Sequence, residues 1–298
     1  MTSMISRVAV TLIAATMLAT AASPLLAQRS PRQQQADVIV VDRDQNPVTD
    51  LGPTDFVVRE DGVAREVISV TPGPPPSPIM LLVDNSQASE PALLDMRRGL
   101  GAFVDALADH EVQIGLRTFG ERPTKVSDPT SPGMVRLGID RLFHRAGSGA
   151  HMLEAIVETA RELEKAGTAG AAIVVFVIES GPEFSQDDRP RVVSALKAAR
   201  ATLWTVVLQS RGGGPTSPEA RERAAVIGDV TAESGGLNLP ILSSQSIPQA
   251  FERLRTLLVA RQRITYGRPD TLVPPERLEV ASGREGLRVL APHWASGQ

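Results

Sequence analysis

Three short, continuous apolar runs most constrain how this chain can fold. They are PIMLLVD (78–84), AAIVVFVI (171–178) and TLWTVVLQ (202–209), and none alternates as a strand with one solvated face does. A strand that is apolar on both sides has to be covered on both sides, as strands of parallel sheets usually are. A fourth run, EVQIGLRTF (111–119), alternates and is expected to be a less buried member of the same sheet.

Amphipathic segments separate these runs. A helix is expected from about Met152 to Lys165, and others at 190–200, 218–231 and 248–262, each of these three with a proline near its start, where a helix tolerates it. Such strand–helix alternation predicts an α/β fold, a doubly wound and mostly parallel Rossmann-like sheet with helices on both faces. The helix expected after the first strand has an apolar stripe made of Leu93, Met96, Leu100, Phe103, Val104 and Leu107.

The first 27 residues have the pattern of a targeting segment. Arg7 precedes the apolar run VAVTLIAATMLATAA, and SPLLA provides a cleavage region that ends at Ala27. A retained membrane anchor is the alternative, but the apolar run is shorter than the roughly 20 residues that a span requires. The sequence therefore predicts an exported protein, periplasmic or secreted, and residues 28–36 (QRSPRQQQA) are expected to be a flexible polar leader.

Strand-like segments flank the α/β region on both sides. Residues 37–72 include a hairpin with Asp61-Gly62 at its turn, and the proline-rich stretch 71–78 is expected to be a stiff linker to the region 78–262. Residues 263–298 return to short strands in RITY, RLEVA and LRVLA. Because so few strands cannot bury a face alone, we expect the two ends of the chain to pair in one small β-domain.

Composition excludes several classes of function. The net charge is −3 with no basic block, which argues against nucleic-acid binding. Cysteine is absent, and aromatic residues make up only 3%, so disulfides, thiolate metal sites and stacking platforms are not expected. The four histidines show no metal-ligand spacing, and no later segment is apolar enough to span a membrane.

Two stretches resemble a known family. VVDRDQNPVTDLGPTDFVVREDGVAREVISV (40–70), followed by IMLLVDNSQAS (79–89), is similar to bacterial exported proteins related to the von Willebrand factor A-type domain. In that family a β-region with a DF…EDG motif precedes the A-type domain and a β tail follows it, as RITY and RLEVASGREGLRV do here.

The resemblance implies a metal-ion-dependent adhesion site on three loops, but the ligand positions have changed. Mg²⁺ would be held there by oxygen ligands in an Asp-x-Ser-x-Ser loop, a threonine loop and an aspartate loop. Asp84 and Ser86 match the first loop, whereas Ala88 has no oxygen to offer. Ala150 stands at the threonine position, and Glu179 and Ser180 stand where Thr-Asp would lie. We therefore expect a degenerate site that holds no metal and no cofactor.

Asp84 has a second interpretation, because an aspartate at a strand end often caps a helix or accepts hydrogen bonds from loop amides. No nucleophile–base pair is recognisable either, and Ser86 lacks the elbow motif of a hydrolase. A non-enzymatic module for protein–protein interaction or adhesion is therefore expected, with an unknown protein partner in the envelope or outside the cell. A structural subunit of an envelope complex and an enzyme with an unrecognised site are the alternatives.

The partner is expected at the loops that follow the strands, because these loops gather at one edge of a doubly wound sheet. They are residues 85–90, 146–151, 180–188 and 210–217. Arg145, Phe184 and Arg211 are the candidate anchors there, since arginine and aromatic residues often dominate interface energies. Ordinary solvent-exposed loops are the alternative.

Overall fold

The computed structural model describes residues 32–210, 212, 216–269 and 274–294. Its largest sheet has six strands in the order β10-β9-β8-β5-β6-β7. All neighbouring pairs except β6–β7 are parallel. The strands are β5 (Ile79–Val83), β6 (Ile114–Thr118), β7 (Thr124–Thr130), β8 (Ala172–Ile178), β9 (Thr202–Leu208) and β10 (Asn238–Ile241).

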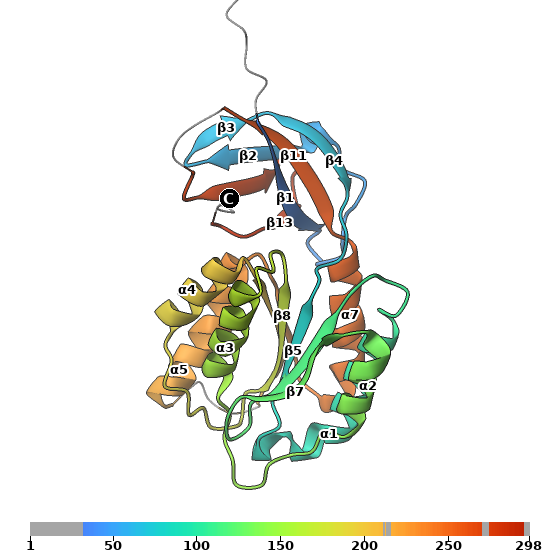
Figure 1. Ribbon diagram of the computed structural model, residues 1–298, viewed down its shortest axis with the longest axis vertical. Helices are drawn as coiled ribbons and strands as arrows, with labels where there is room; N and C mark the ends of the chain where they lie inside the picture. Colours follow the sequence, from blue (N-terminus) through green and yellow to red (C-terminus); the bar gives the residue numbers. More distant parts are fainter. Residues whose placement is uncertain (1–31, 211, 213–215, 270–273, 295–298) are drawn as a thin grey trace, which may run out of the picture. The chain divides into compact units, whose positions relative to one another are not determined.

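Helices cover both faces of this sheet (Figure 1). One face carries α3 (Met152–Lys165), α4 (Arg189–Ala199) and α5 (Pro218–Ala225); the other carries α1 (Leu93–Asp105), α2 (Pro132–Asp140) and α7 (Ile247–Val259). Every residue of β5 and β8 is buried, because side chains on both sides of these strands contact a helical layer. The predicted doubly wound α/β fold is confirmed.

Four elements of this region differ from the sequence-based expectation. The edge strands β7 and β10 and helix α2 were not predicted, because TKVSDPT contains one apolar residue besides proline, β10 has only four residues and one is proline, and α2 has only nine residues. The helix expected over 218–231 is interrupted by a π-helical turn at Val226–Val230, after which a single turn, α6 (Thr231–Glu233), completes it.

The strand segments at the two ends of the described chain pair with each other, as predicted. One sheet has the order β13-β1-β11-β4 and a second the order β12-β2-β3. Thus β1 lies between two C-terminal strands, and β2 pairs with both β3 and β12. The strands are β1 (Arg32–Val41), β2 (Phe56–Glu60), β3 (Val63–Arg65), β4 (Val67–Pro72), β11 (Gln262–Arg268), β12 (Leu278–Ser282) and β13 (Arg288–Leu290).

The expected flexible leader is wrong for residues 32–36. They form the first half of β1 and pair with β11, with Gln34 opposite Tyr266. The polar run was read as unstructured, but the backbone hydrogen bonds of a strand do not depend on apolar side chains. The predicted signal segment 1–27 and residues 28–31 lie outside the described residues.

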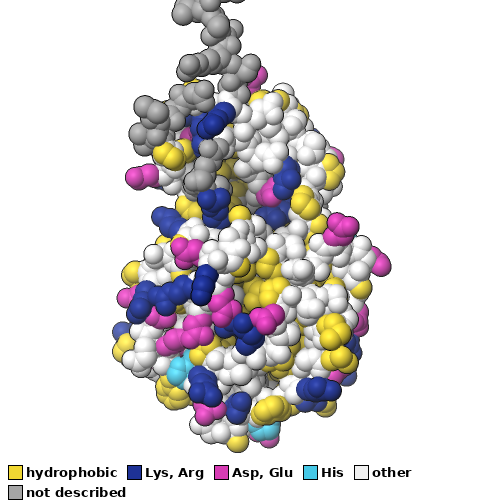
Figure 2. Space-filling view, in the orientation of Figure 1, with side chains coloured by type: hydrophobic (Ala, Val, Ile, Leu, Met, Phe, Trp, Pro, Cys, Tyr) yellow, Lys and Arg dark blue, Asp and Glu magenta, His cyan; other side chains and the backbone are white. Residues whose placement is uncertain are grey.

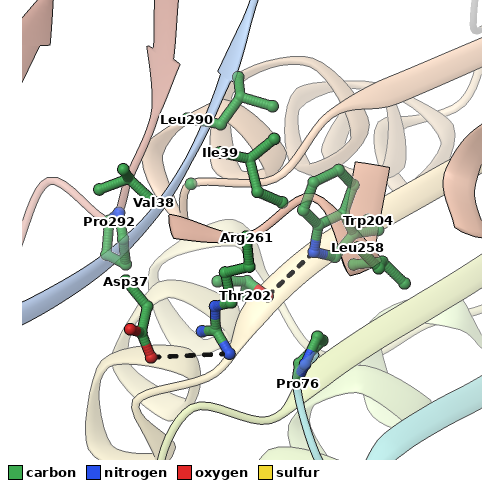
Figure 3. A pocket seen from close by; sticks show the side chains of 11 residues that line it. Asp37, Val38, Ile39, Pro76, Thr202, Trp204, Leu258, Arg261, Leu290 and Pro292 are labelled. Carbon is green, nitrogen blue, oxygen red and sulfur yellow. Dashed lines mark hydrogen bonds and ion pairs between the residues drawn. The ribbon is translucent and has the colours of Figure 1, made fainter. Parts of the chain in front are cut away.

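The β-strands of the chain ends pack onto the α/β region (Figure 3). Ile39 of β1 and Leu290 of β13 belong to the same apolar cluster as Trp204 of β9. Nη1 of Arg261, just before β11, lies 3.8 Å from Oδ2 of Asp37. The cavity left between these groups has a volume of about 20 Å³. Because that is room for about one water molecule, this contact is a packed junction rather than a ligand site.

Candidate functional site

The loop after β5 begins with two buried polar residues. Oδ1 of Asp84 accepts a hydrogen bond from the backbone N–H of Ser86 (2.9 Å), and Oδ2 accepts one from Ile178 N–H at the end of β8 (3.1 Å). These are the loop-amide hydrogen bonds expected of an aspartate at a strand end. Both carboxylate oxygens thus hold backbone groups, and Asp84 ties the first loop to the strand beside it.

Asn85 connects the same loop to two others. Its Oδ1 accepts from Gly120 N–H (2.8 Å), its Nδ2 donates to the carbonyl of Phe143 (3.2 Å), and its own carbonyl accepts from Arg145 N–H (2.7 Å). The close approach requires a glycine at 120, because a Cβ there would lie 2.5 Å from the nitrogen of Ser86. The loops after β5 and β6 and the segment 143–145 are therefore fastened at one residue.

The second and third predicted loops pair with each other at Ala150. Its N–H donates to the carbonyl of Pro182 (2.9 Å), and its carbonyl accepts from Phe184 N–H (2.8 Å). Ala150 also bridges to Gly120 and is fully buried. A residue enclosed by backbone on both sides offers nothing to a ligand, so Ala150 is part of the floor of this site.

A buried acid and a buried arginine lie beneath these loops. Oε1 of Glu183 accepts from Met152 N–H at the start of α3 (2.9 Å) and from the Ser185 hydroxyl (2.5 Å). Arg223 of α5 donates to the carbonyls of Gly181 (3.0 Å) and Glu179 (2.7 Å), and its Nη1 lies 3.6 Å from Oε2 of Glu183. One guanidinium thus holds the backbone of the third loop from within.

The two buried acids have raised pKa values. Burial raises the pKa of Asp84, and hydrogen bonds from Ser86 and Ile178 together with the charge of Arg223 oppose that shift. Burial also raises the pKa of Glu183 to about 7, against Ser185, Arg223 and the Met152 amide, while the charge of Asp84 adds to the rise. Asp84, Glu183 and Arg223 therefore form one electrostatically linked cluster.

The remaining predicted positions divide into separate groups. Ser86 is buried beside Asp84, and a Cβ on Gly181 would lie 2.9 Å from that of Ala88, so the first and third loops touch there. Glu179 does not turn into the site, because its Oε2 accepts from Ser210 N–H (2.9 Å). Ser180 is exposed. Asp84 and Ser86 are buried together, Ala88 and Ser180 line one small surface hollow, and the Glu179 carboxylate is bonded to the segment after β9 instead.

Two of the three predicted partner anchors lie in the described residues, and both border a surface depression. Phe184 is half-exposed, with its ring centroid 6.1 Å from that of His151, and the Arg145 guanidinium lies 5.3 Å from the Phe143 ring centroid. These residues line a depression of about 500 Å³ with the glycine-rich segment 146–149. The third anchor, Arg211, lies outside the described residues.

The sequence reasoning missed Phe143 and Arg223, and it included Asn85 and Glu183 only as members of the predicted loops 85–90 and 180–188, without singling them out. Arg223 follows Glu222 in a highly charged segment that reads as a solvated face, and only the packing of α5 turns it inward. Glu183 gave no local signal, because the helix start that it caps, at Met152 N–H, is 31 residues away in the sequence. Asn85, next to Asp84, could have been singled out as a second polar residue at a strand end.

The described part of the chain contains neither a metal-binding cluster of side chains nor a membrane-spanning helix. Within it, no group of three or more histidine, aspartate or glutamate side chains is arranged to hold a metal ion. None of its helices combines the length and apolarity needed to cross a bilayer.

Comparisons with known proteins give low similarity. No family model matches the chain, and no curated protein matches it. Among solved structures, a von Willebrand factor type A protein from Catenulispora acidiphila is 10% identical, with 88% of this chain and 72% of that chain covered and a TM-score of 0.47. BatB from Bacteroides thetaiotaomicron is 14% identical, with 61% and 98% covered and a TM-score of 0.43.

A third similar structure is proximal thread matrix protein 1 from the mussel byssus. It is 13% identical, the match covers 63% of this chain but only 49% of that one, and the TM-score is 0.48. This chain therefore corresponds to about half of the mussel protein. Identities this low do not establish membership of a family.

Proposed function

We propose that this protein is a non-enzymatic module that binds a protein partner through the loops at the carboxyl ends of its parallel strands. We also propose that it does so outside the cytoplasm and without a divalent cation. The N-terminal targeting pattern supports export. The loops at 85–90, 146–151 and 180–188, with the segment 143–145, are called the loop face below. Their geometry supports protein binding and independence of a divalent cation.

One observation carries the proposal: three charged side chains of the loop face are buried and bonded to loop backbone, while its aromatic rings are exposed. Asp84, Glu183 and Arg223 are buried and bonded to backbone groups of the loops, whereas Phe143 and Phe184 are more than half exposed. Catalysis requires titratable groups that converge on a substrate. Exposed aromatic rings beside an arginine on a well-fastened surface are the composition of a protein-binding hot spot.

The donor set also fits Mg²⁺ poorly. Both oxygens of Asp84 are used by amides, and Ala88 and Ala150 have no side-chain oxygen. Ser86 Oγ is buried without a hydrogen-bond partner among the described residues, so one potential ligand remains. Mg²⁺ prefers a near-octahedral shell of oxygen atoms, usually with one or two carboxylates. Arg223 places a positive charge in the same cluster, which disfavours a second cation there.

Partner capture tests the binding proposal. The mature protein, immobilised, is exposed to envelope and secreted fractions of its host with and without EDTA, and the captured protein is then purified and its affinity measured. We expect a specific partner, equal capture in EDTA, and a loss of at least about tenfold in affinity for Phe184→Ala or Arg145→Glu. Val63→Ala, at an exposed position of β3 in the other part of the molecule, is the control. Loss of capture in EDTA, or full capture by both loop variants, would contradict the proposal.

Calorimetric titration with MgCl₂ and MnCl₂ tests the metal-free part separately. We expect no one-site isotherm in the millimolar range. A clear isotherm that disappears in Asp84→Ala would show that the site binds metal. The triple change Ala88→Ser, Ala150→Thr and Ser180→Asp restores the missing oxygens and is the matched comparison.

A further inference from the structure

A groove that the sequence did not predict lies beside the loop face. It runs between the edge strand β7 and helix α2, ends at the segment 141–145, and has a volume of about 560 Å³. Phe143 and Arg145 line both this groove and the loop-face depression, so the two surfaces are continuous. Hydrophobic side chains also reach the surface over α2 in Figure 2, with Lys or Arg side chains beside them.

The groove exposes large apolar side chains from three segments. Val126 of β7, Met134 and Leu137 of α2, and Phe143 are 41% to 60% exposed. Gly138 forms part of the floor, since a Cβ there would lie 3.1 Å from Val126 and 3.2 Å from Leu116. Clustered apolar residues of this size are unusual on a monomeric surface and mark interaction sites more often than single exposed residues do.

The charged groups of the groove all have one sign. Lys125, Arg141 and Arg145 line it, and none of the described lining residues is acidic. Lys125 is paired with Asp128 (2.7 Å) and lies 3.6 Å from Glu162, and Arg145 lies 3.5 Å from Glu121. Arg141 is exposed and makes no ion pair with any described residue. An apolar groove with the charge of Arg141 at its rim is complementary to an apolar segment that carries carboxylates.

We propose that this groove binds a peptide segment of a partner protein that presents bulky apolar side chains flanked by Asp or Glu. This inference rests on the proposed function and adds the chemistry of the partner. Residues 1–31 of the chain itself are a poor occupant, because they contain Arg7 and Arg29 and no acidic residue.

Side chains rather than backbone should make the contact. The β6–β7 pairing has register shifts on both sides of Leu116, and Pro129 in β7 has no N–H to donate. Irregular pairing and an edge proline both hinder the addition of a further strand. The partner segment is therefore expected to lie in the groove between β7 and α2 rather than to extend the sheet.

Selection from a displayed library of random short peptides tests the inference without knowledge of the partner. The full mature protein is the bait, and enriched peptides are synthesised with matched versions in which Asp and Glu become Asn and Gln. Their affinities are measured for the unmodified protein and for the variants Leu137→Glu and Arg141→Glu. Leu94→Glu on α1 and Leu242→Glu after β10, both at more exposed positions outside the groove, are the controls.

We expect enrichment of peptides that combine aromatic or aliphatic residues with acidic ones. Binding should weaken by at least about tenfold in Leu137→Glu and by several-fold in Arg141→Glu, but not in the controls. The amide versions should bind more weakly, and added salt should reduce the difference. Enrichment of basic peptides, equal binding by all variants, or self-association that Leu137→Glu abolishes would overturn the inference.

The outcomes also separate this inference from the proposed function. If a captured protein partner binds Leu137→Glu and Arg141→Glu normally but loses Phe184→Ala, the groove proposal fails and the binding function stands. If no partner is captured at all while acidic peptides bind the groove, the groove inference stands and the loop-face function fails.

Discussion

Two buried glutamates, one in each part of the molecule, are held in different ways. Glu60, at the end of β2, accepts hydrogen bonds from Arg65 (2.9 Å), Tyr266 (2.9 Å) and Arg268 (2.7 Å from Nη2). Glu183, under the loop face, has one oxygen bonded to Met152 N–H and Ser185, while the other meets only Arg223 at 3.6 Å. The first carboxylate is fully satisfied, and the second is only partly so.

The pKa values follow this difference. Burial opposes ionisation of Glu60, but the hydrogen bonds from Arg268, Tyr266 and Arg65 outweigh it and hold its pKa below the usual value. For Glu183, burial outweighs its partners and raises the pKa to about 7. Glu60, which joins strands from the two ends of the described chain, is therefore ionised at neutral pH. Glu183, beneath the loop face, changes between its neutral and ionised forms near pH 7.

The largest expected effect is at Glu60. Its replacement in Glu60→Ala leaves the guanidinium of Arg268 buried without its partner, and breaking a buried pair in this way costs about 3–5 kcal/mol of unfolding free energy. Urea unfolding of the mature protein measures the loss. The control is Arg98→Ala, because Arg98 forms an exposed pair with Asp95 and should change stability by no more than about 0.5 kcal/mol. If Glu60→Ala lost as little unfolding free energy as Arg98→Ala, the ion pairs of Glu60 would not stabilise the fold.

The next effect is the pH dependence contributed by Glu183. Its folded pKa of about 7 exceeds the ordinary value of 4.5, so the folded state binds its proton more tightly. Ionisation in the unfolded state then lowers stability as pH rises from about 4.5 to 7, by up to about 3 kcal/mol, and the effect levels off above pH 7. The pH dependence contributed by Glu60 has the opposite sign. Its stabilising contribution is present at neutral pH and is lost only as pH falls through its lowered pKa.

The variant Glu183→Gln isolates the contribution of Glu183 to the pH dependence of stability. The variant keeps a side-chain oxygen for Met152 N–H but cannot ionise, so its unfolding free energy should vary less between pH 4.5 and 7. Denaturant titrations at a series of pH values compare the two proteins. Arg223 and Asp84 face the same cluster and remain in both proteins. Parallel pH profiles would show that the pKa of Glu183 is not raised.

A somewhat smaller effect is expected at Arg223. Arg223→Met removes the hydrogen bonds to the carbonyls of Glu179 and Gly181, which costs about 2 kcal/mol, and it removes the charge that opposes the rise in the Glu183 pKa.

Double-mutant cycles compare the two buried glutamates directly. The coupling between Glu60 and Arg268 should exceed that between Glu183 and Arg223, because only the first pair is hydrogen-bonded. Equal coupling energies for the two pairs would show that Glu60 and Glu183 are held equally strongly by their arginine partners.

The same contrast explains what the sequence could and could not predict. The sheet followed from continuous apolar runs such as residues 79–83 and 172–178, since burial of both faces leaves a direct mark on composition. The pairing of the chain ends followed from strand counts. Arg223 and Glu183 could not be predicted, because a charged residue looks the same in sequence whether packing turns it inward or leaves it in solvent. The groove was missed because α2 has only nine residues and β7 has one apolar residue besides proline.

The smallest effect on stability is expected where the effect on binding is largest. Phe184 is half-exposed, so Phe184→Ala should change the unfolding free energy by only about 0.5–1 kcal/mol, whereas Phe176→Ala, in the fully buried strand β8, should cost about 3–5 kcal/mol. Phe184 does contact Gly149, whose added Cβ would lie 2.5 Å from Cε2 of the ring, so a small loss is expected. Thermal unfolding and partner affinity are measured on the same preparations. If Phe184→Ala lost stability as Phe176→Ala does, the exposed ring would be a structural part of the loop face, and its loss of binding would no longer identify an interface.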